Sequence, residues 1–404
     1  MIKRELYMER VRPFINSELI KVLTGIRRSG KSVMLELIQD ELVQMGVSRE
    51  QFICYNFERM ENARLCTSEA LHEDIMGRCQ ERGQKTYLFF DEIQEVRDWE
   101  RCVNSLRLDL DCDIYITGSN AKLLSGELAT YLGGRYVEFV IYPFSFAEFM
   151  ELYRTVFPEA DTARCFQAYL TKGGMPYLSN LRFEDEPSRR YLEDLFNSVV
   201  LKDIVKRNGV RDVDMLERII GYAMANIGTT FSATSISKFL KSEHRSVSTD
   251  SVLNDLRYCM AAFLIYQAGR EDLRGKRILS TNEKYYVADH GLREAVYGGN
   301  TRDINLTLEN IVYMELKRRG YDVHVGKLGE REIDFVCSRR EEKLYIQVSY
   351  LLASEETAGR EFGVFEAIRD NYPKYVVTMD EFDMSRNGYR HWNIRDFLLS
   401  NQWN

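Results

Sequence analysis

Apolar positions in the segment 1–150 follow two alternating spacings. Short apolar, β-branched runs, typical of buried strands, are followed by stretches in which apolar residues recur every three or four positions, the spacing of one helix face. Five such runs occur, at residues 19–24, 52–57, 86–92, 113–120 and 136–142. Strands that alternate with helices form parallel sheets. Residues 1–150 are therefore predicted to be an α/β domain with a five-stranded parallel sheet.

The pattern changes after residue 150 and divides the rest of the chain into three predicted domains. The first is a helical segment interrupted by glycine and proline. The second has three helices followed by a β-hairpin, the α+β plan of a winged helix. The third begins with an amphipathic helix and continues with strands, as an α/β domain. Their ranges are 151–208, 209–298 and 299–404.

A glycine-rich loop lies between the first predicted strand and the helix that follows it. The loop, Gly25-Ile-Arg-Arg-Ser-Gly-Lys-Ser32, fits the phosphate-binding pattern G-x-x-x-x-G-K-[ST]. Backbone N–H groups of such a loop close around phosphate, and the positive end of the helix faces it. We expect Lys31 to reach the β- and γ-phosphates of a nucleoside triphosphate and the Ser32 hydroxyl to hold Mg²⁺. The residues expected to contact nucleotide are Gly25, Ile26, Arg27, Arg28, Ser29, Gly30, Lys31, Ser32 and Val33.

Two carboxylates end the third predicted strand, at the edge of the sheet where ligands bind in open α/β folds. We expect Asp91 to orient Mg²⁺, directly or through water, and Glu92 to polarise the attacking water. The fourth predicted strand ends in small polar residues. Either Ser119 or Asn120 is the candidate for detecting the γ-phosphate, and an ordinary strand-end turn is the alternative.

Three arginines near this site have roles that the sequence leaves open. Arg27 and Arg28, inside the loop, are expected to face solvent, although either could contact nucleotide. Arg135 precedes the last predicted strand and could supply positive charge to a transition state, from the same subunit or from a neighbouring subunit of an oligomer. A solvated surface arginine is the alternative.

These motifs resemble those of the AAA+ superfamily, and most closely the bacterial and archaeal ATPases in which an AAA domain precedes a C-terminal domain of unknown function. The resemblance implies ATP rather than GTP as the nucleotide, with ADP as product. It also implies that segment 151–208 is a helical lid over the nucleotide and that 209–298 is a winged helix. It covers nearly the whole chain and is carried by GIRRSGKS, YLFFDEIQEV, ITGSNAKLL, GGRYVEFVIYPFSFAEF and residues 169–176, 200–203 and 309–310.

The last predicted domain resembles the core of PD-(D/E)XK nucleases. That chemistry uses an Asp and a Glu to hold Mg²⁺ and a Lys to position water. Asp334 stands at the aspartate position, but the E-x-K element reads Gln347-Val-Ser349, which lacks the carboxylate and the ammonium. We therefore expect a non-catalytic relative of these nucleases. Glu309, Glu315, Asp334 and Gln347 could line a binding pocket, and a structural sheet with solvated carboxylates is the alternative.

Charge leaves the class of partner open. The net charge of −7 provides no global basic field for nucleic acid, and residues 231–290 carry nine Lys and Arg against seven Asp and Glu. If the winged helix binds DNA, its third helix enters the major groove and the basic turn 274–277 follows the phosphates. The same module could instead dock a protein. The sequence thus predicts an ATP-driven conformational switch acting on DNA or on a protein, with an ATP-regulated nuclease as the weakest alternative.

The sequence also argues against a membrane segment and against a zinc or disulfide framework. The chain starts without an apolar signal core and has no run of 18 apolar residues, so we expect a cytoplasmic protein without a membrane segment. Its eight cysteines form no C-x-x-C pair and do not cluster with the five histidines, which argues against a zinc site or a disulfide framework.

Overall fold

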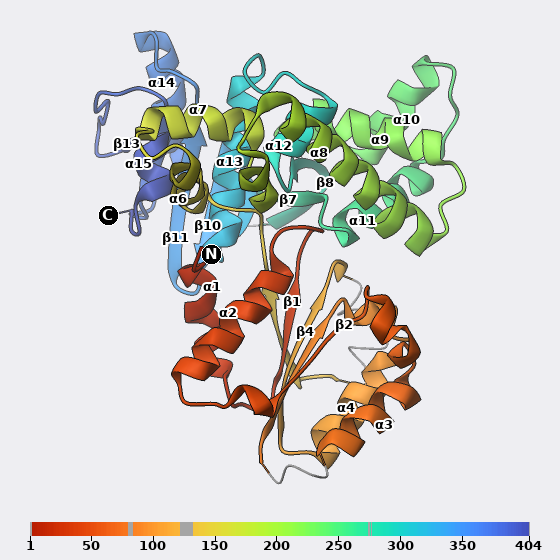
Figure 1. The fold of residues 1–404 in the computed structure, drawn as a ribbon. Helices are drawn as coiled ribbons and strands as arrows, with labels where there is room; N and C mark the ends of the chain where they lie inside the picture. The colour runs from red at the N-terminus through yellow and green to blue at the C-terminus, as the bar shows by residue number, and fades with distance from the viewer. Residues whose placement is uncertain (1, 80–83, 122–131, 274, 276, 404) are drawn as a thin grey trace. The chain divides into compact units, whose positions relative to one another are not determined.

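The computed structural model of the protein describes residues 2–79, 84–121, 132–273, 275 and 277–403 (Figure 1). The chain divides into two compact units. The first contains Met1–Pro143 together with Ala261–Phe263, and the second contains Phe144–Met260 together with Leu264–Asn404. None of the described helices is long and apolar enough to cross a membrane.

Five parallel strands form the sheet of the first unit, in the order β2-β3-β4-β1-β5. The predicted five-stranded parallel sheet is therefore confirmed. Strands β1 and β3 are buried along their whole length, as expected where helices cover both faces of a parallel sheet. The strands are β1 Ile20–Thr24, β2 Phe52–Asn56, β3 Thr86–Asp91, β4 Cys112–Gly118 and β5 Tyr136–Val140.

Helices flank this sheet on both sides, with α2 on one face and the packed pair α3 and α4 on the other (Figure 1). Apolar side chains of β1, β3 and β4 form a core with α3 and α4, which include Leu71 and Leu106. The helices are α1 Glu5–Val11, α2 Lys31–Gln44, α3 Ser68–Cys79 and α4 Trp99–Asp109. Short 3-10 turns are η1 Arg12–Phe14, η2 Arg49–Gln51, η3 Met60–Leu65 and η4 Ile93–Glu95.

The second unit is built on one eight-stranded mixed sheet, in the order β13-β12-β11-β10-β9-β7-β8-β6. Its central hairpins are antiparallel. Three pairs are parallel, namely β7 with β9, β11 with β12, and β12 with β13. The strands are β6 Thr230–Phe231, β7 Ile265–Asp272, β8 Arg277–Val287, β9 Asp322–Leu328, β10 Arg331–Arg339, β11 Glu342–Val348, β12 Lys374–Thr378 and β13 Arg390–Asn393.

Helices of the second unit include the predicted helical segment and the three predicted winged-helix helices. The break expected at the glycine pair is present, because α7 ends before Gly173, which has a left-handed φ of 71°. The helices are α6 Phe146–Val156, α7 Thr162–Lys172, α8 Asp185–Ser198 with a π-helical extension Val199–Lys206, α9 Val213–Ala225, α10 Ala233–Ser242, α11 Thr249–Ala261, α12 His290–Val296, α13 Ile304–Arg318, α14 Glu355–Gly363 and α15 Ile394–Leu399. The second unit also contains two 3-10 turns, η6 Pro176–Leu181 and η8 Val364–Ala367.

The boundaries inside the second unit differ from those expected. Strand β7 of the predicted wing hairpin pairs in parallel with β9 of the predicted nuclease-like domain, with Arg270 opposite Val325. Helix α8 of the predicted lid packs against α12. Residues 151–208, 209–298 and 299–404 therefore share one compact unit, since backbone pairing and helix packing cross both expected boundaries. The basic turn of the hairpin includes Arg274 and Lys276, which lie outside the described residues.

Candidate functional site

The glycine loop joins β1 to α2 at the carboxyl end of the first sheet. Gly25 has a φ of 136°, and a Cβ there would lie 2.2 Å from the carbonyl oxygen of Ile141. Gly30, the residue before α2, has a φ of 99°. Both backbone conformations strongly favour glycine. The two glycines of the motif therefore hold the loop in a tight turn against the end of β5.

Polar groups of the loop are arranged around this turn. Lys31 is buried, and its Nζ donates to the carbonyl oxygens of Gly25 (3.0 Å) and Ile26 (3.1 Å). The buried Oγ of Ser29 has no hydrogen-bond partner among the residues that the structure describes. Ser32 and Val33 are exposed at the start of α2. A lysine ammonium and an unpaired hydroxyl thus lie on the same loop, at a helix N-terminus.

A buried arginine from the N-terminal segment supports the loop from outside the motif. The Arg4 guanidinium donates to the carbonyl oxygen of Ser29 (2.9 Å) and to that of Tyr142 (2.8 Å). Arg4 is 3% exposed. No local sequence pattern points to this contact, because both partners of Arg4 lie far from it along the chain. Arg4 fixes the loop to the segment that follows β5.

The two acidic residues lie at the same edge of the sheet, at the end of β3. Asp91 accepts hydrogen bonds from the Thr117 hydroxyl (2.5 Å) and from the Asn56 amide (2.7 Å). The Thr117 hydroxyl also accepts from the backbone N–H of Glu92 (2.9 Å). Glu92 has a left-handed φ of 55°, a conformation that non-glycine residues seldom adopt. Strands β2 and β4 therefore fix the acidic pair from both sides.

Thr117, inside β4, contacts both residues of the acidic pair. Ser119 and Asn120 follow β4 and are buried. Their proposed role in detecting phosphate stays a prediction. The sequence does not single out Thr117, because it lies inside the strand, where a threonine is also an ordinary β-former.

The three arginines have separate surroundings. Arg27 forms an ion pair with Glu58 (2.9 Å), with its side chain only 12% exposed, so the expectation that it faces solvent is wrong. Arg28 is exposed.

Arg135 lies at the far end of the sheet from the loop. Its carbonyl oxygen accepts a hydrogen bond from the N–H of Ile20, the first residue of β1. The glycine loop follows Thr24, the last residue of the same strand. Five residues of a strand span about 16 Å. Its exposed guanidinium donates to Asn104 (3.2 Å). The structure thus does not bring Arg135 to the loop of the same subunit, and its action from a neighbouring subunit stays a prediction.

Comparisons with known proteins agree with this geometry. Residues 17–150 match the family model of an AAA domain. An uncharacterized protein of Haemophilus influenzae is 39% identical over 401 residues, which cover 99% of each chain. Residues 17–150 form an AAA+ domain, and the whole chain belongs to one family with the Haemophilus influenzae protein. Residues 163–303 of this AAA+ protein match a domain of unknown function, DUF8612. An uncharacterized protein of Methanocaldococcus jannaschii is 29% identical over 87% of this chain and 79% of its own length.

Solved structures of low identity are also similar to this AAA+ protein. Orc1 of Aeropyrum pernix, determined in complex with DNA, has 13% identity and a TM-score of 0.32, covering 75% of this chain and 93% of its own. The replication initiator DnaA, bound to AMPPCP and single-stranded DNA, has 16% identity and a TM-score of 0.32, covering 63% and 86%. The AAA assignment of residues 17–150 rests on the family model rather than on these structures.

The region predicted to be nuclease-like contains a lysine where the sequence suggested a pocket of acids. Lys284 of β8 is buried and forms ion pairs with Glu332 (2.8 Å), Glu309 (2.9 Å) and Asp334 (3.4 Å). Burial, reinforced by Glu309, raises the pKa of Asp334 to about 7, and Lys284 opposes this rise. Among the described residues, no group of three or more His, Cys, Asp or Glu is arranged to hold a metal ion. The single ammonium offsets part of the negative charge of these three carboxylates.

The other two candidates of this region, Gln347 and Glu315, have different surroundings. Gln347 accepts from the backbone N–H of Asp334 (3.2 Å) and so borders the cluster. Glu315 instead pairs with Arg318 (2.5 Å) and Arg319 (2.7 Å). Glu315 thus has partners other than Lys284, and a pocket lined by all four candidates stays a prediction.

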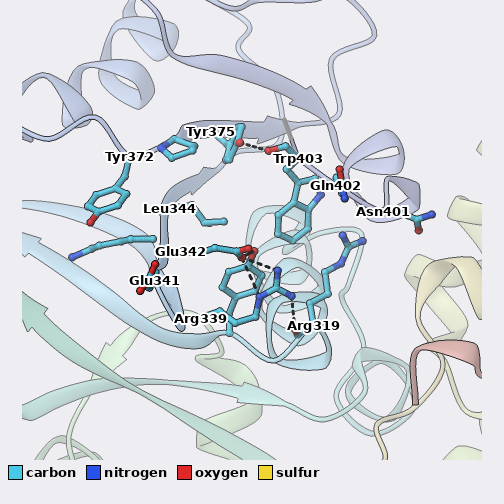
Figure 2. A pocket seen from close by; sticks show the side chains of 13 residues that line it. Arg319, Arg339, Glu341, Glu342, Leu344, Tyr372, Tyr375, Asn401, Gln402 and Trp403 are labelled. Atoms are coloured by element: carbon cyan, nitrogen blue, oxygen red, sulfur yellow. Dashed lines mark hydrogen bonds and ion pairs between the residues drawn. The ribbon is translucent and has the colours of Figure 1, made fainter. Parts of the chain in front are cut away.

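A separate cavity of about 410 Å³ lies where β11 and β12 begin. Figure 2 shows Arg319 and Arg339 in it, with their guanidinium carbons 4.2 Å and 4.5 Å from the ring centres of Trp403 and Tyr321. Arg339 also pairs with Glu342 (2.7 Å), and Arg319 has the carboxylate partner described above. Each guanidinium thus has a carboxylate partner, and Arg319 shares its partner with Arg318.

Proposed function

We propose that the protein binds Mg²⁺–ATP and hydrolyses it to ADP and phosphate. The observation that carries this proposal is the adjacency of three strands. Strand β4 pairs with both β3 and β1, so the acidic pair, Thr117 and the glycine loop share one edge of the sheet. A phosphate-binding loop beside a strand that ends in two acids is the arrangement of P-loop NTPases.

The residues present fit a nucleotide phosphate and a metal ion. Lys31 supplies positive charge, and the α2 N-terminus offers backbone N–H groups. The Ser29 hydroxyl, which has no partner among the described residues, can donate to a phosphate. Ser32 and Asp91 are oxygen ligands of the kind that Mg²⁺ prefers. When bound, Mg²⁺ would neutralise charge on the phosphates. Glu92 would accept the proton of the attacking water.

We further propose that the nucleotide state controls the second unit, as a switch. DNA is one candidate for the macromolecule acted upon, through α11 and the β7–β8 hairpin. The exposed positions Asp250, Asn254 and Arg257 of α11 carry no net charge. In addition, Phe239 of α10 is 42% exposed and Leu253 of α11 is 36% exposed. These apolar side chains favour a protein partner as the second candidate.

Steady-state ATP hydrolysis tests the proposal. We expect Glu92→Gln to keep ATP affinity within about threefold, measured by calorimetry, and to lower kcat by about 100-fold or more. Glu95→Gln is the matched control, because Glu95 is exposed three residues further on. Normal turnover by Glu92→Gln would refute the assigned base, and no turnover by the wild type would refute the ATPase itself.

Duplex DNA added to the same assay separates the two partner classes. Turnover stimulated by DNA in a salt-sensitive way, and lost in Glu92→Gln, supports a switch on DNA. Turnover unchanged by DNA, together with no DNA binding at low salt, supports the protein partner.

A further inference from the structure

Gln94 lies on η4, two residues after Glu92, and its side chain turns back to the Glu92 carboxylate. Its Nε2 donates a hydrogen bond to Glu92 Oε2. A carboxylate only accepts hydrogen bonds, so the amide nitrogen is the atom that faces Glu92, and the amide oxygen points away from it. This oxygen is buried, and it has no hydrogen-bond partner within the part of the chain that the structure describes.

Glu92 is therefore fixed at two points. Thr117 holds its backbone N–H in the left-handed conformation, and Gln94 holds its carboxylate. Residues kept in such sparsely populated conformations concentrate at functional sites. A buried acceptor without a donor also costs free energy and needs an explanation. A donor that arrives with the substrates would satisfy the Gln94 oxygen.

We propose that Gln94 is a positioning residue for the attacking water, an inference that rests on the proposed ATPase. One O–H of the water faces Glu92, and the other donates to Gln94 Oε1. The water oxygen forms a bond to the γ-phosphorus as the bond from that phosphorus to the bridging oxygen breaks. ADP leaves with the electron pair, and Glu92 takes the proton. Gln94 thus orients both the base and the nucleophile, and transfers no proton itself.

Two substitutions separate the two contacts of Gln94. Gln94→Leu keeps the approximate size and removes both contacts. Gln94→Glu keeps an acceptor oxygen for water but removes the donor to Glu92 and places a second negative charge beside it. Gln44→Leu is the matched control, since Gln44 is exposed on α2 of the same unit.

We expect Gln94→Leu to lower kcat for ATP hydrolysis by about 30-fold or more, with ATP affinity within about threefold of the wild type. We expect Gln94→Glu to move the rising limb of the kcat profile to higher pH, because two adjacent carboxylates favour the protonated pair. A purely structural role would lower thermal stability and leave the pH profile in place. Gln44→Leu should match the wild type in both measurements.

The outcomes distinguish this inference from the proposed function. Wild-type kcat in Gln94→Leu, with Glu92→Gln inactive, would overturn the role of Gln94 and leave the ATPase intact. An unshifted pH profile in Gln94→Glu would also overturn it, and this variant decides the question if Gln94→Leu fails to fold. If the wild type does not hydrolyse ATP, the proposed function fails, and this inference fails with it.

Discussion

At the residue scale, the first unit contains a fully buried ion pair. The Lys21 ammonium pairs with the Asp113 carboxylate, and both side chains are 0% exposed. Asp113 also accepts from the Asn16 N–H (2.8 Å) and the Tyr115 hydroxyl (2.8 Å). Burial lowers the pKa of Lys21, and the charge of Asp113 opposes that change. The carboxylate therefore keeps a buried ammonium charged beside the sheet.

Removing that carboxylate charge should destabilise the first unit strongly. We expect Asp113→Asn to lower the free energy of unfolding by about 3–5 kcal/mol, since it leaves Lys21 buried without a counter-charge. Urea unfolding followed by circular dichroism measures the change. Asp40→Asn is the control, because Asp40 pairs with Arg49 on the surface (2.8 Å) and its loss should cost no more than about 1 kcal/mol.

The lysine of the second unit predicts a pH-dependent effect. Burial alone would lower the pKa of Lys284, but Glu309, Asp334 and Glu332 together raise it above its ordinary value. A raised lysine pKa stabilises the fold at all pH values below the unfolded pKa. We expect Lys284→Met to lower the free energy of unfolding by about 3–5 kcal/mol at pH 8.

The loss in Lys284→Met should shrink at pH 5.5. Even with Lys284 present, the pKa of Asp334 is about 7, which is above its value in the unfolded chain. The folded state therefore takes up a proton as the pH falls through that range. This uptake stabilises the folded state relative to the unfolded state. Urea unfolding at the two pH values measures this. Equal losses at pH 8 and pH 5.5 would contradict the role of the ammonium as counter-charge.

The residues of the site divide into those that a local pattern reveals and those that need strand register. The glycine loop, Lys31 and the acids at 91 and 92 were predictable, because their chemistry lies in contiguous residues. Thr117 and Asn56 were not, since they reach Asp91 only through the pairing of β4 and β2 with β3. Lys284 was hidden for the same reason, because its carboxylate partners lie on elements that follow it much later in the chain.

At the element scale, one buried aspartate connects two separate turns of the second unit. Asp289 caps α12, accepting from the N–H of Leu292 (3.2 Å), and it also accepts from the N–H of Gly174 (2.6 Å). A Cβ on Gly173 would meet the Asp289 carboxylate at 2.2 Å. The glycine pair that the sequence showed as a helix break is therefore also a contact surface for α12.

This double role predicts a large effect for a capping residue. We expect Asp289→Ala to lower the free energy of unfolding by about 3 kcal/mol, because the buried Gly174 N–H loses its partner and α12 loses its cap. Asp161→Ala is the matched control, since Asp161 caps α7 with one exposed hydrogen bond to the Arg164 N–H (2.7 Å). Its expected cost is about 1 kcal/mol. Equal costs would show that the contact with Gly174 adds no stability.

The sequence was informative about single elements and less so about how those elements pair. All five strands of the first sheet and the three helices α9 to α11 lie close to where periodicity placed them. The β7–β8 hairpin is present, but its strands were expected at 263–266 and 284–287 and extend further toward the turn, over Ile265–Asp272 and Arg277–Val287. Periodicity indicates which residues of one element are buried, but it does not indicate which other element packs against them. For this reason the pairing of β7 with β9 could not be predicted from the sequence.

At the scale of the whole molecule, that pairing makes the expected winged-helix segment dependent on residues beyond it. We expect residues 209–298 alone to show no cooperative unfolding, because β7 loses its pairing with β9 and Lys284 loses its three carboxylates. Residues 144–404 should unfold cooperatively, since they contain the whole eight-stranded sheet. Thermal unfolding followed by circular dichroism compares the two fragments. A cooperative transition in residues 209–298 would contradict this dependence.

The same strand order has a consequence for how the chain is made. Translation proceeds from the N-terminus, so β7 and β8 leave the ribosome before β9 exists to cover them. Arg270 can pair with Leu279 of β8 early, but its pairing with Val325 must wait until the whole of α12 and α13 has been added. During that interval the nascent chain presents an open strand edge, which is the kind of surface that recruits other unfolded chains. Slow synthesis between these two strands would therefore favour aggregation, and a ribosome-bound chaperone that shields the hairpin would favour the native sheet.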